Sequence, residues 1–499
     1  MNAAATVPEV ASLDQARTII SDQFHTIQQL NWQVTQLKKQ LFGNSSERQV
    51  ESTLSQEQVL LSFFPEPAQP AATQQVLLLP REERTDVRPR RQPAAKVLET
   101  VTERIEPAEK VCPHCGKEKC EIGQEKSERY EYVPAKIVRH ELIRPKLACP
   151  CGQAGVSIAP LPPTVVAQGQ PAASLVAHVL LSKYADHLPL YRQQQQFARL
   201  GVNFPKSTLS DWVEQGARWL QPIVREMKGQ LLQRDYVQVD ETPVKVQDPD
   251  VIGKCATGWL WVMGAPHSDV IFEFHPGRGK EFAQQLLGDF KGYLQRDGYG
   301  VYGSLARDKL ELKPVGCWAH ARRKFIEAIE GQRALAMPIV DELRKLYMVE
   351  RHARDEDLAA EQRHLLRQQL SLPILTALKP ILQSARDKVL PESPMGKATR
   401  YCLGDWAALN AYLGDGRLEI DNNLTENAIR PSAIGKKNWL FIGHPDAGWR
   451  SAVIYSIIVS CKRRNIDPWE YLRDVLSRIP AMQQSQISSL LPANWKPVV

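Results

Sequence analysis

Three acidic residues stand where the sequence could assemble a metal-dependent site. Asp240 follows the alternating stretch YVQV, Asp297 follows YLQR, and Glu426 lies in GRLEIDNNLTENAIRPSAIGKKNWLFIG, among amides and cations. Three clustered carboxylates repel one another unless cations bind them, and the hard divalent ions Mg²⁺ and Mn²⁺ prefer oxygen ligands. Two such ions would activate a water or a 3′-hydroxyl and stabilise the leaving oxygen of a phosphodiester displacement. We therefore predict that these acids are catalytic and hold two ions of Mg²⁺ or Mn²⁺.

Each acid also has a plain structural explanation. Asp240 could be a polar strand terminus, and Asp297, with the glycine that follows it, could be a hairpin turn. Glu426 could complete a capping box by reaching back to the cap amide of Asn423. For each acid alone, the structural explanation is at least as good as catalysis. For all three together it requires a coincidence, because the acids occupy the positions that a nuclease-like sheet demands. No P-loop, G-x-S-x-G elbow or H-E-x-x-H pair offers a competing catalytic apparatus.

The segments around the acids predict a mixed sheet in an α/β protein. YVQVDETPVKV, TGWLWVM, DVIFEF and YLQRDGYG are strand-like, RGKEFAQQLLGDF between the last two is helical, and Lys313 to Cys317 offers a fifth strand. In an order of three strands, a helix and a strand, the first and fourth strands can lie side by side. Asp240, which closes the first strand, would then lie beside Asp297, which closes the fourth.

A helix packed against that sheet would supply Glu426. Its capping role and its catalytic role compete, because a carboxylate held at the cap has less freedom to coordinate a cation. Pro431 would end or kink this helix after Arg430, so the helix is predicted to be short.

Basic and aromatic residues near the acids are consistent with a nucleic-acid substrate. Clusters of this kind can neutralise phosphates, although each alone is as typical of a solvated face. The second-rank candidates for substrate or metal-shell contacts are His320, Arg322, Arg323, Arg430 and Lys437. Four tryptophans could stack on bases, although tryptophan in or beside a strand is more often core: Trp259, Trp261, Trp318 and Trp439.

Two pairs of cysteines predict a zinc module. Cys112 and Cys115 lie in VCPHCG, and Cys149 and Cys151 lie in ACPCG, with an alternating stretch between the pairs. Thiolates in two close pairs on hairpin tips suit tetrahedral zinc. The second pair is tighter than the usual C-x-x-C, so Cys120 or His114 could replace one of its ligands.

The N-terminal part predicts a helix able to pair with a partner. Apolar residues recur every seven positions at Ile20, Ile27, Val34 and Leu41. This seam favours self-association into a homo-oligomer over docking on the chain's own body. The Pro-, Gln- and Arg-rich stretch that follows has no sustained period and is predicted to be a largely disordered linker.

A helical region precedes the first strand. A helix, a turn at Gly201 and Val202, and a second helix from about Lys206 have the order of a helix-turn-helix, and plain helical packing explains the pattern equally well. The long charged stretch from about Gly331 to Leu413 has almost no strand pattern and is predicted to be an all-helical insertion. The closing residues predict two helices broken at Asp467 and Pro468.

Length and composition indicate several globular modules. At 499 residues, one domain per roughly 150 residues suggests about three domains. The content of 43% hydrophobic and 24% charged residues, with no long apolar run and no export signal, predicts a cytoplasmic protein without a membrane partner. A DNA-binding function would make it nucleoid-associated. The net charge of +7 permits a polyanionic partner but does not require one.

Several motifs, in matching order over nearly the whole chain, resemble transposases of the insertion sequence sixty-six family. They are LKKQLFGNSSER, CPHCG, VQVDETPVKV, YLQRDGYGVYGSL, GCWAHARRKF and the Glu426 stretch with its IYSIIVSCKRRNIDPWEYL sequel. The resemblance implies a ribonuclease-H-like catalytic domain whose Asp-Asp-Glu triad falls on Asp240, Asp297 and Glu426. It also implies a zinc-binding module, a helical domain that recognises transposon ends, and small accessory proteins of the same element.

We therefore predict a transposase that binds the inverted repeats at the ends of its element as an oligomer, and cuts and joins double-stranded DNA. The alternatives are a catalytically silent DNA-binding relic and a nuclease of the same fold that does not join. The predicted domains are a coiled-coil-like helix (1–50), the linker (51–96), the zinc module (97–160), the helical DNA-binding domain (161–232), the ribonuclease-H-like domain (233–445) with its helical insertion (about 331–413), and a C-terminal helical segment (446–499).

Overall fold

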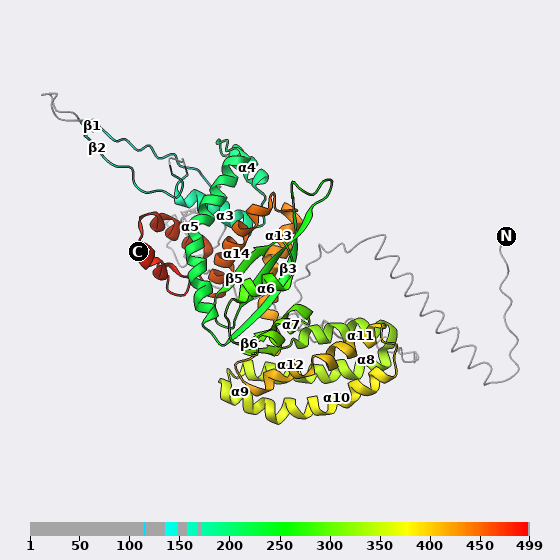
Figure 1. The fold of residues 1–499 in the computed structure, drawn as a ribbon. Helices are drawn as coiled ribbons and strands as arrows, with labels where there is room; N and C mark the ends of the chain where they lie inside the picture. The colour runs from blue at the N-terminus through cyan, green and yellow to red at the C-terminus, as the bar shows by residue number, and fades with distance from the viewer. Residues whose placement is uncertain (1–113, 115–134, 148–156, 168–170, 498–499) are drawn as a thin grey trace, which may run out of the picture. The chain divides into compact units, whose positions relative to one another are not determined.

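The computed structural model describes residues 114, 135–147, 157–167 and 171–497 (Figure 1). From residue 135 on, these residues belong to one compact unit, Glu128–Val499, and the fold below is that of this unit. The predicted coiled-coil-like helix, the linker and all four cysteines of the zinc module lie outside the described residues. The short strands β1 (Lys146–Leu147) and β2 (Ser157–Ile158) pair antiparallel and belong to the predicted zinc module, 97–160.

A five-stranded mixed sheet forms the centre of the described unit (Figure 1). Its order is β5-β4-β3-β6-β7, with β3, β4 and β5 antiparallel and with β6 and β7 parallel to β3. The first and fourth of these strands are neighbours, as predicted. The strands are β3 (Tyr236–Val246), β4 (Ala256–Gly264), β5 (Val270–His275), β6 (Gly292–Gln295) and β7 (Leu312–Val315).

The prediction that Asp240 closes the first strand is wrong. Strand β3 runs on to Val246, because β4 pairs with it along the whole stretch from Gln238 to Val246. The parallel pairing of β3 with β6 is shorter and stops at Gln238. Asp240 therefore lies just beyond the end of the parallel pairing, inside an otherwise continuous strand.

Helix α14 (Gly448–Arg463) covers the edge strand β5. Two of its serines are buried, and their hydroxyls accept hydrogen bonds from β5: the Phe272 amide binds Ser456 Oγ at 2.8 Å and the Val270 amide binds Ser460 Oγ at 2.9 Å. An edge strand otherwise presents unpaired amides that invite aggregation. The polar residues inside this apolar helix therefore close the sheet edge.

The predicted helical region before the sheet contains three described helices, α3 (Ala173–Tyr184), α4 (Leu190–Arg199) and α5 (Lys206–Leu232). The predicted turn is present between α4 and α5, where Gly201 has φ of +86°, a conformation that favours glycine. Helix α5 starts at the predicted residue, Lys206. Whether α4 and α5 act as a helix-turn-helix stays a prediction.

The C-terminal pair of helices follows the predicted break. Helix α14 ends at Arg463, and α15 (Pro468–Arg478) begins after Asp467, whose carboxylate accepts a hydrogen bond from the Trp469 amide at 2.9 Å. Proline in the first turn costs no hydrogen bond there, because its position lacks an intrahelical acceptor. Helix α15 packs against α3, so the end of the chain joins the helical region to the sheet.

A second hydrophobic core lies among the helices between β7 and residue 421. The residues of the predicted insertion contain no strand among them, and the long first helix breaks at Gln332, close to the predicted start. The helices are α8 (Trp318–Asp355), α9 (Ala360–Leu366), α10 (Leu372–Asp387), α11 (Pro394–Gly404) and α12 (Trp406–Asn410). Two shorter helices flank β6, namely α6 (Lys280–Leu287) and α7 (Gly300–Asp308).

Helix α13 (Asn423–Trp439) carries Glu426 and corrects two predictions. The capping box is wrong, because Asn422 is the cap residue and no side chain caps the helix; Asn423 instead donates to Asp421 at 2.9 Å. The predicted short helix is also wrong, because α13 continues through Pro431. A proline removes one backbone hydrogen bond, and packing of α13 against β3 and β4 offsets that loss.

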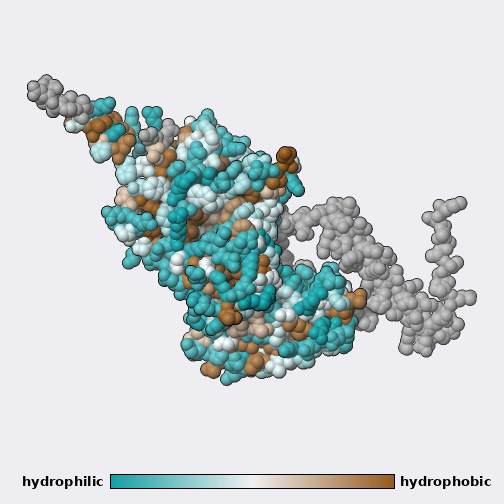
Figure 2. Space-filling model, in the orientation of Figure 1, coloured by the Kyte–Doolittle hydropathy of each residue, from teal (hydrophilic) through white to brown (hydrophobic). Residues whose placement is uncertain are grey.

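Hydrophilic side chains predominate on the face shown in Figure 2, and hydrophobic ones are scattered over it. None of the helices in the described ranges has the length and apolar character needed to span a bilayer.

Candidate active site

The register of the parallel strands aligns the two aspartates. Gln238 on β3 pairs with Gln295 on β6, and Asp240 and Asp297 each lie two residues beyond that pair. Asp240 Oδ1 accepts a hydrogen bond from the next amide at 2.8 Å, and Asp297 Oδ1 accepts one from the Tyr299 amide at 3.0 Å. The two aspartates therefore occupy equivalent positions, just past the end of the pairing between β3 and β6.

Glu426 joins these aspartates from the first turn of α13. The pKa of Asp240 is raised well above its ordinary value by burial and by the negative charges of Glu241, Asp297 and Glu426. Asp297 and Glu426 are therefore close enough for their charges to act on Asp240. We call Asp240, Asp297 and Glu426 the carboxylate cluster.

Two side chains of helix α8 approach Glu426. His320 Nδ1 lies 3.4 Å from Glu426 Oε1, and Arg323 Nη2 lies 3.4 Å from Glu426 Oε2. Burial lowers the pKa of His320, although the charges of Glu426 and Asp297 act to raise it. His320 Nδ1 and Glu426 Oε1 are both buried without a hydrogen-bond partner in the structure. The cluster therefore has more negative charge than its neighbours compensate.

These residues fit a divalent cation. A buried carboxylate with a raised pKa, next to a buried carboxylate oxygen without a donor, is a set of oxygen ligands that lacks positive charge. Possible ligand atoms of Cys317, His320 and Glu426 also lie within 4.8 Å of one another. Burial raises the pKa of the Cys317 thiol to about 12, and a protonated thiol is a poor ligand for a hard ion. The carboxylate cluster is the better candidate.

A fourth acid beside the cluster has side-chain partners, although burial still raises its pKa. Glu241 accepts hydrogen bonds from Arg278 Nε and from the Tyr302 hydroxyl, both at 2.7 Å. The Arg278 guanidinium also lies over the ring of Tyr299, 3.7 Å from its centroid. Glu241 was not among the predicted residues, and its carboxylate binds two side chains, whereas the hydrogen bond to Asp240 comes from a backbone amide.

Buried amides that the sequence analysis missed tie the elements of the site together. Gln238 Nε2 donates to Gln295 Oε1 at 2.8 Å and to the Asp421 carbonyl at 3.2 Å, and its Oε1 accepts from the Thr425 hydroxyl. The Tyr236 hydroxyl donates to Gln295 Oε1. We call Tyr236, Gln238 and Gln295 the glutamine cluster. It links β3 and β6 to the start of α13.

A signal for the glutamine cluster is present in the sequence. Both aspartates are preceded two residues earlier by glutamine, in QVD and in QRD. A polar residue at a position where the strand is otherwise apolar needs a buried partner. The same offset in two strands that are expected to pair would have indicated that the glutamines meet each other.

The second-rank basic residues do not all lie at the carboxylates. His320 and Arg323 contact Glu426, whereas the charge of Arg322, on another side of the same helix, acts on the pKa of Tyr347. Arg430 and Lys437 are exposed on α13. Neither contacts the carboxylate cluster within the described part of the chain.

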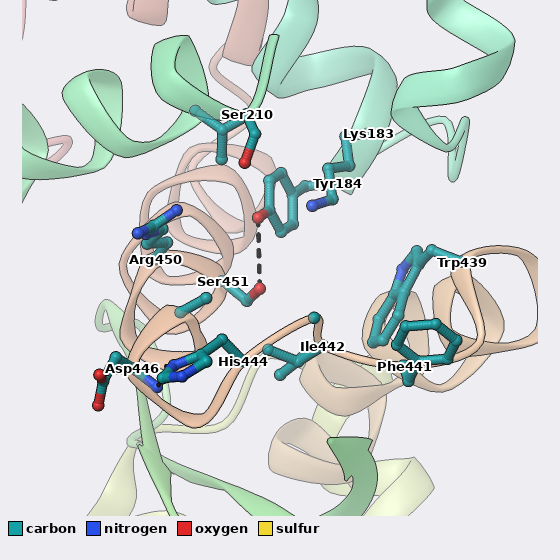
Figure 3. A pocket seen from close by; sticks show the side chains of 13 residues that line it. Lys183, Tyr184, Ser210, Trp439, Phe441, Ile442, His444, Asp446, Arg450 and Ser451 are labelled. Atoms are coloured by element: carbon teal, nitrogen blue, oxygen red, sulfur yellow. Dashed lines mark hydrogen bonds and ion pairs between the residues drawn. The ribbon is translucent and has the colours of Figure 1, made fainter. Parts of the chain in front are cut away.

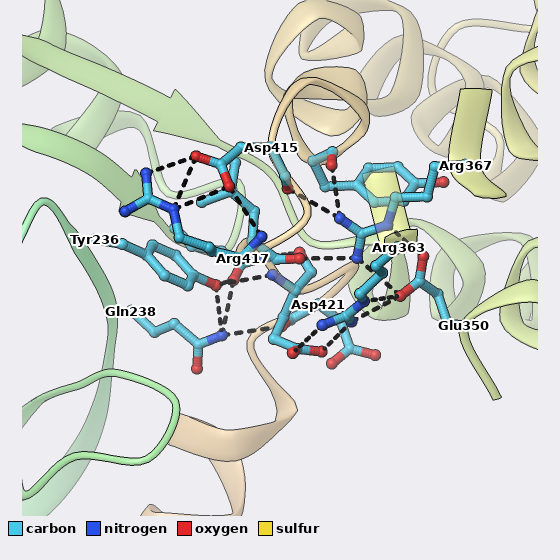
Figure 4. A network of polar contacts seen from close by, with 12 residues as sticks. Tyr236, Gln238, Glu350, Arg363, Arg367, Asp415, Arg417 and Asp421 are labelled. Atoms are coloured by element: carbon cyan, nitrogen blue, oxygen red, sulfur yellow. Dashed lines mark hydrogen bonds and ion pairs between the residues drawn. The ribbon is translucent and has the colours of Figure 1, made fainter. Parts of the chain in front are cut away.

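A different set of charges holds the segment that leads into α13 (Figure 4). Arg367 is fully buried and donates to both oxygens of Glu350, at 2.7 and 2.8 Å. Arg363 bridges Glu350 and Glu419 through contacts of 2.7 to 3.1 Å. Although burial acts to raise the pKa of Glu350, Arg367 and Arg363 hold it below its ordinary value. We call Glu350, Arg363, Arg367 and Glu419 the arginine cluster.

Comparisons with known families agree over most of the chain. The family model described as "Transposase IS66 family" matches residues 168–450, and "zinc-finger binding domain of transposase IS66" matches 109–152. "IS66 C-terminal element" matches 456–493, and "Transposase C of IS166 homeodomain" matches 29–102. The zinc-finger match contains all four predicted cysteines and supports a structural zinc.

Similar curated proteins come from Sinorhizobium fredii. "Uncharacterized protein y4jD" is 35% identical over 79% of this chain and 79% of its own length. "Uncharacterized protein y4qI" is 35% identical over 82% of this chain and 78% of its own length, and "Uncharacterized protein y4hP" is 29% identical over 94% and 88%. The first family model spans more than half of the 499 residues, including Asp240, Asp297 and Glu426. The chain belongs to the IS66 family of transposases.

Proposed function

We propose that this transposase binds the terminal inverted repeats of an insertion sequence and catalyses metal-dependent DNA cleavage and strand transfer at the carboxylate cluster. The proposal includes a ribonuclease-H-like catalytic domain, which the strand order β5-β4-β3-β6-β7 supports. It also includes a homo-oligomer, accessory proteins of the same element and a place at the nucleoid, which rest on the resemblance and the heptad pattern alone.

The observation that carries this proposal is the convergence of three acids from distant parts of the sequence. Asp240, Asp297 and Glu426 lie on β3, after β6 and on α13, and burial together with the charges of Glu241, Asp297 and Glu426 raises the pKa of Asp240. A fold gains nothing from such a cluster unless a cation binds it, because like charges at short range destabilise the folded state.

Each residue then has a defined role. Asp240, Asp297 and Glu426 would hold Mg²⁺ or Mn²⁺, which when bound would activate the attacking oxygen and stabilise the leaving oxygen. Arg323 contacts Glu426, and its side chain is 56% exposed, so it can meet a DNA phosphate. His320 contacts the other Glu426 oxygen and limits the orientations of that carboxylate.

The test is strand cleavage and joining on DNA that carries the ends of the element, in the presence of Mg²⁺. Asp240→Asn and Glu426→Gln should each lower the rate at least about 100-fold, because each removes charge from the metal ligands. Glu392→Gln is the control, since that side chain is 75% exposed and pairs only with Lys397 and Arg400. Full activity in either active-site variant would disprove the triad.

The same assay separates the alternatives. Cleavage without a joined product would indicate a nuclease, and binding of the ends without any cleavage would indicate a silent DNA-binding protein.

The zinc proposal has its own test. Metal analysis of the purified protein should find zinc, and Cys112→Ser should lower its content. Cys255→Ser is the control, because Cys255 is a free cysteine outside the zinc-finger match. Unchanged zinc in Cys112→Ser would remove Cys112 from the ligand set.

A further inference from the structure

A pocket of about 470 Å³ lies where the helical region meets the end of α13 (Figure 3). Lys183 and Tyr184 line it from α3, and Ser210 lines it from α5. The rest of the lining runs from Trp439 at the end of α13 to Ser451 in the first turn of α14. Ser210 belongs to the second turn of α5, the helix that the sequence predicts to contact DNA. The pocket is separate from the carboxylate cluster, and the residues of that cluster do not line it.

Two aromatic side chains form one side of the pocket. Trp439 and Phe441 lie next to each other in Figure 3, and Phe441 is 39% exposed although its side chain is large and apolar. The backbone holds Phe441 in place from both sides. Leu440 has φ of +67°, which is strained for a residue with a side chain, and Ile442 forms a parallel bridge with Val246 of the sheet. The fold therefore maintains an exposed aromatic ring at a fixed position.

Cations line the other sides. Lys183 has no carboxylate partner among the described residues, and its Nζ lies 5.0 Å from the centroid of the Tyr184 ring. Arg450 pairs with Glu214 at 2.5 Å, but Glu214 also pairs with Arg218, so two guanidinium groups share one carboxylate. Arg450 Nε is buried and has no hydrogen-bond partner in the structure.

Acceptors and acids complete the lining. The Tyr184 hydroxyl and Ser451 Oγ lie 3.3 Å apart at one wall of the pocket. The only carboxylate of the lining, Asp446, has a side chain that is 91% exposed and lies 3.4 Å from His444. Apart from Asp446, the lining therefore combines aromatic rings with the basic side chains of Lys183 and Arg450.

We propose that this pocket binds a nucleotide of DNA whose base has left the duplex. The base would stack on Trp439 and Phe441, and its phosphate would lie near Lys183 and Arg450. A flat aromatic wall with cations beside it matches a base joined to a phosphate, and stacking accepts any base because every base has a π-face. A base pair inside a duplex has no free face to offer, so the pocket selects an unpaired nucleotide. The proposal rests on the proposed function in taking DNA as the partner.

Helix α13 connects the pocket to the carboxylate cluster. It carries Glu426 in its first turn and Trp439 as its last residue. At about 1.5 Å of rise per residue the two lie about 20 Å apart, which is about six nucleotide steps at about 3.4 Å each. One DNA strand can thus reach both sites. Extrusion of a base in the pocket would fix the strand at a set distance from the carboxylates.

The test is DNA binding by the full-length Asp240→Asn variant in a metal chelator, so that cleavage plays no part. The probes are a labelled duplex and the same duplex with one unpaired thymidine, compared by fluorescence anisotropy at one salt concentration. The protein should prefer the duplex with the unpaired thymidine. Trp439→Ala and Phe441→Ala should each lower the affinity for that probe at least about 5-fold and leave the affinity for the perfect duplex nearly unchanged.

Controls separate stacking from general damage. Trp469→Ala removes a half-buried tryptophan of α15 and should change neither affinity. If Trp439→Ala unfolds, Phe441→Ala decides, because its side chain is partly exposed. Equal losses on both probes, or no loss on either, would overturn the proposal. Competition by free thymidine monophosphate at the same concentration as the unpaired probe would also overturn it, since the pocket would then recognise a free nucleotide.

Discussion

The carboxylate cluster and the arginine cluster contain similar groups in opposite electrostatic states. In the carboxylate cluster, burial and neighbouring acids raise the pKa of Asp240. In the arginine cluster, Glu350 is fully buried whereas Asp240 is only half-buried, yet Arg367 and Arg363 hold the pKa of Glu350 below its ordinary value. The protein can therefore neutralise buried carboxylates where it needs to. The lack of such a partner at Asp240 supports the proposal that a cation completes the carboxylate cluster.

The two clusters are joined through one short segment. Glu419 belongs to the arginine cluster through Arg363, and its carbonyl accepts a hydrogen bond from Gln295 of the glutamine cluster at 2.8 Å. Two residues later the Asp421 carbonyl accepts from Gln238, and α13 with Glu426 follows. The arginine cluster therefore helps to position Glu426 of the carboxylate cluster.

The largest expected effect on stability comes from removing Arg367 from the arginine cluster. Arg367→Met leaves Glu350 buried with only Arg363, and it removes donors from the carbonyls of Tyr412, Asp415 and Leu418. Removing one partner of a buried ion pair typically costs about 3–5 kcal/mol. We expect a loss of that size in the free energy of unfolding, measured by chemical denaturation.

The matched control for this variant is Arg386→Met in α10. Arg386 is 53% exposed and pairs with the equally exposed Asp387, so its loss should cost less than about 1 kcal/mol. Similar losses in the two variants would show that the arginine cluster contributes no more than a surface pair.

A smaller effect is expected from Gln295→Leu, which breaks the link between the clusters. The substitution removes contacts to Tyr236, Gln238 and the Glu419 carbonyl, and leaves buried donors unpaired at a typical cost of about 1–3 kcal/mol. A misplacement of about 1 Å can cost about 100-fold in rate. We therefore expect strand cleavage at saturating Mg²⁺ to fall about 10-fold to 100-fold while DNA binding is retained.

This prediction separates positioning from stability. Leu346 lies in the second core and makes none of the hydrogen bonds of the link, so Leu346→Ala is expected to lose about 2–5 kcal/mol of stability with little effect on cleavage below its unfolding temperature. If both variants lost cleavage in proportion to stability, the glutamine cluster would have no separate positioning role.

The sequence is sufficient to predict the sheet and the meeting of the two aspartates. Alternation of period two defines the strands, and the order of three strands, a helix and a strand brings β3 beside β6. The length of β3 beyond Asp240 could not be predicted from that order, because it depends on how far β4 pairs with it.

The cap of α13 and the arginine cluster show where local patterns fail. Asn423 has the right spacing for a capping box with Glu426, but its side chain donates to Asp421 instead. Local spacing does not show which of these two acids becomes its partner. Glu350 and Arg367 lie in a charged helical stretch that is typical of a solvated surface, and both are fully buried. A single charged residue does not show whether its partner is water or another helix.

Removing a negative charge from the carboxylate cluster should change the free energy of unfolding less, and in the opposite direction. Asp240→Asn removes one negative charge from the carboxylate cluster, so in a metal chelator the free energy of unfolding should stay equal or rise, by on the order of 1 kcal/mol. Added Mg²⁺ should raise the melting temperature of the wild type and change that of Asp240→Asn much less, measured by calorimetry. A loss of several kcal/mol in the chelator would mean that Asp240 binds a partner within the protein.

The smallest effect is a pH dependence whose sign differs between the clusters. The folded-state pKa of Asp240 is raised, so the folded protein holds that proton more tightly than the unfolded chain does. Its contribution to stability is complete below the ordinary carboxyl pKa and is lost as the pH rises through the raised value. Glu350 has a lowered pKa, so its contribution is present above the ordinary value and is lost as the pH falls through the lowered one.

Unfolding in a metal chelator across the acidic and neutral range separates these two contributions. The stability of the wild type should fall as the pH rises above the ordinary carboxyl pKa, and Asp240→Asn should reduce that slope, because an amide does not titrate. The slope on the acidic side, which Glu350 contributes to, should persist in Asp240→Asn. Mg²⁺ should flatten only the fall in stability with rising pH. A bound cation favours the ionised form of Asp240, whereas Glu350 already has guanidinium partners. If Asp240→Asn lost stability with rising pH as steeply as the wild type, a group other than Asp240 would cause that loss.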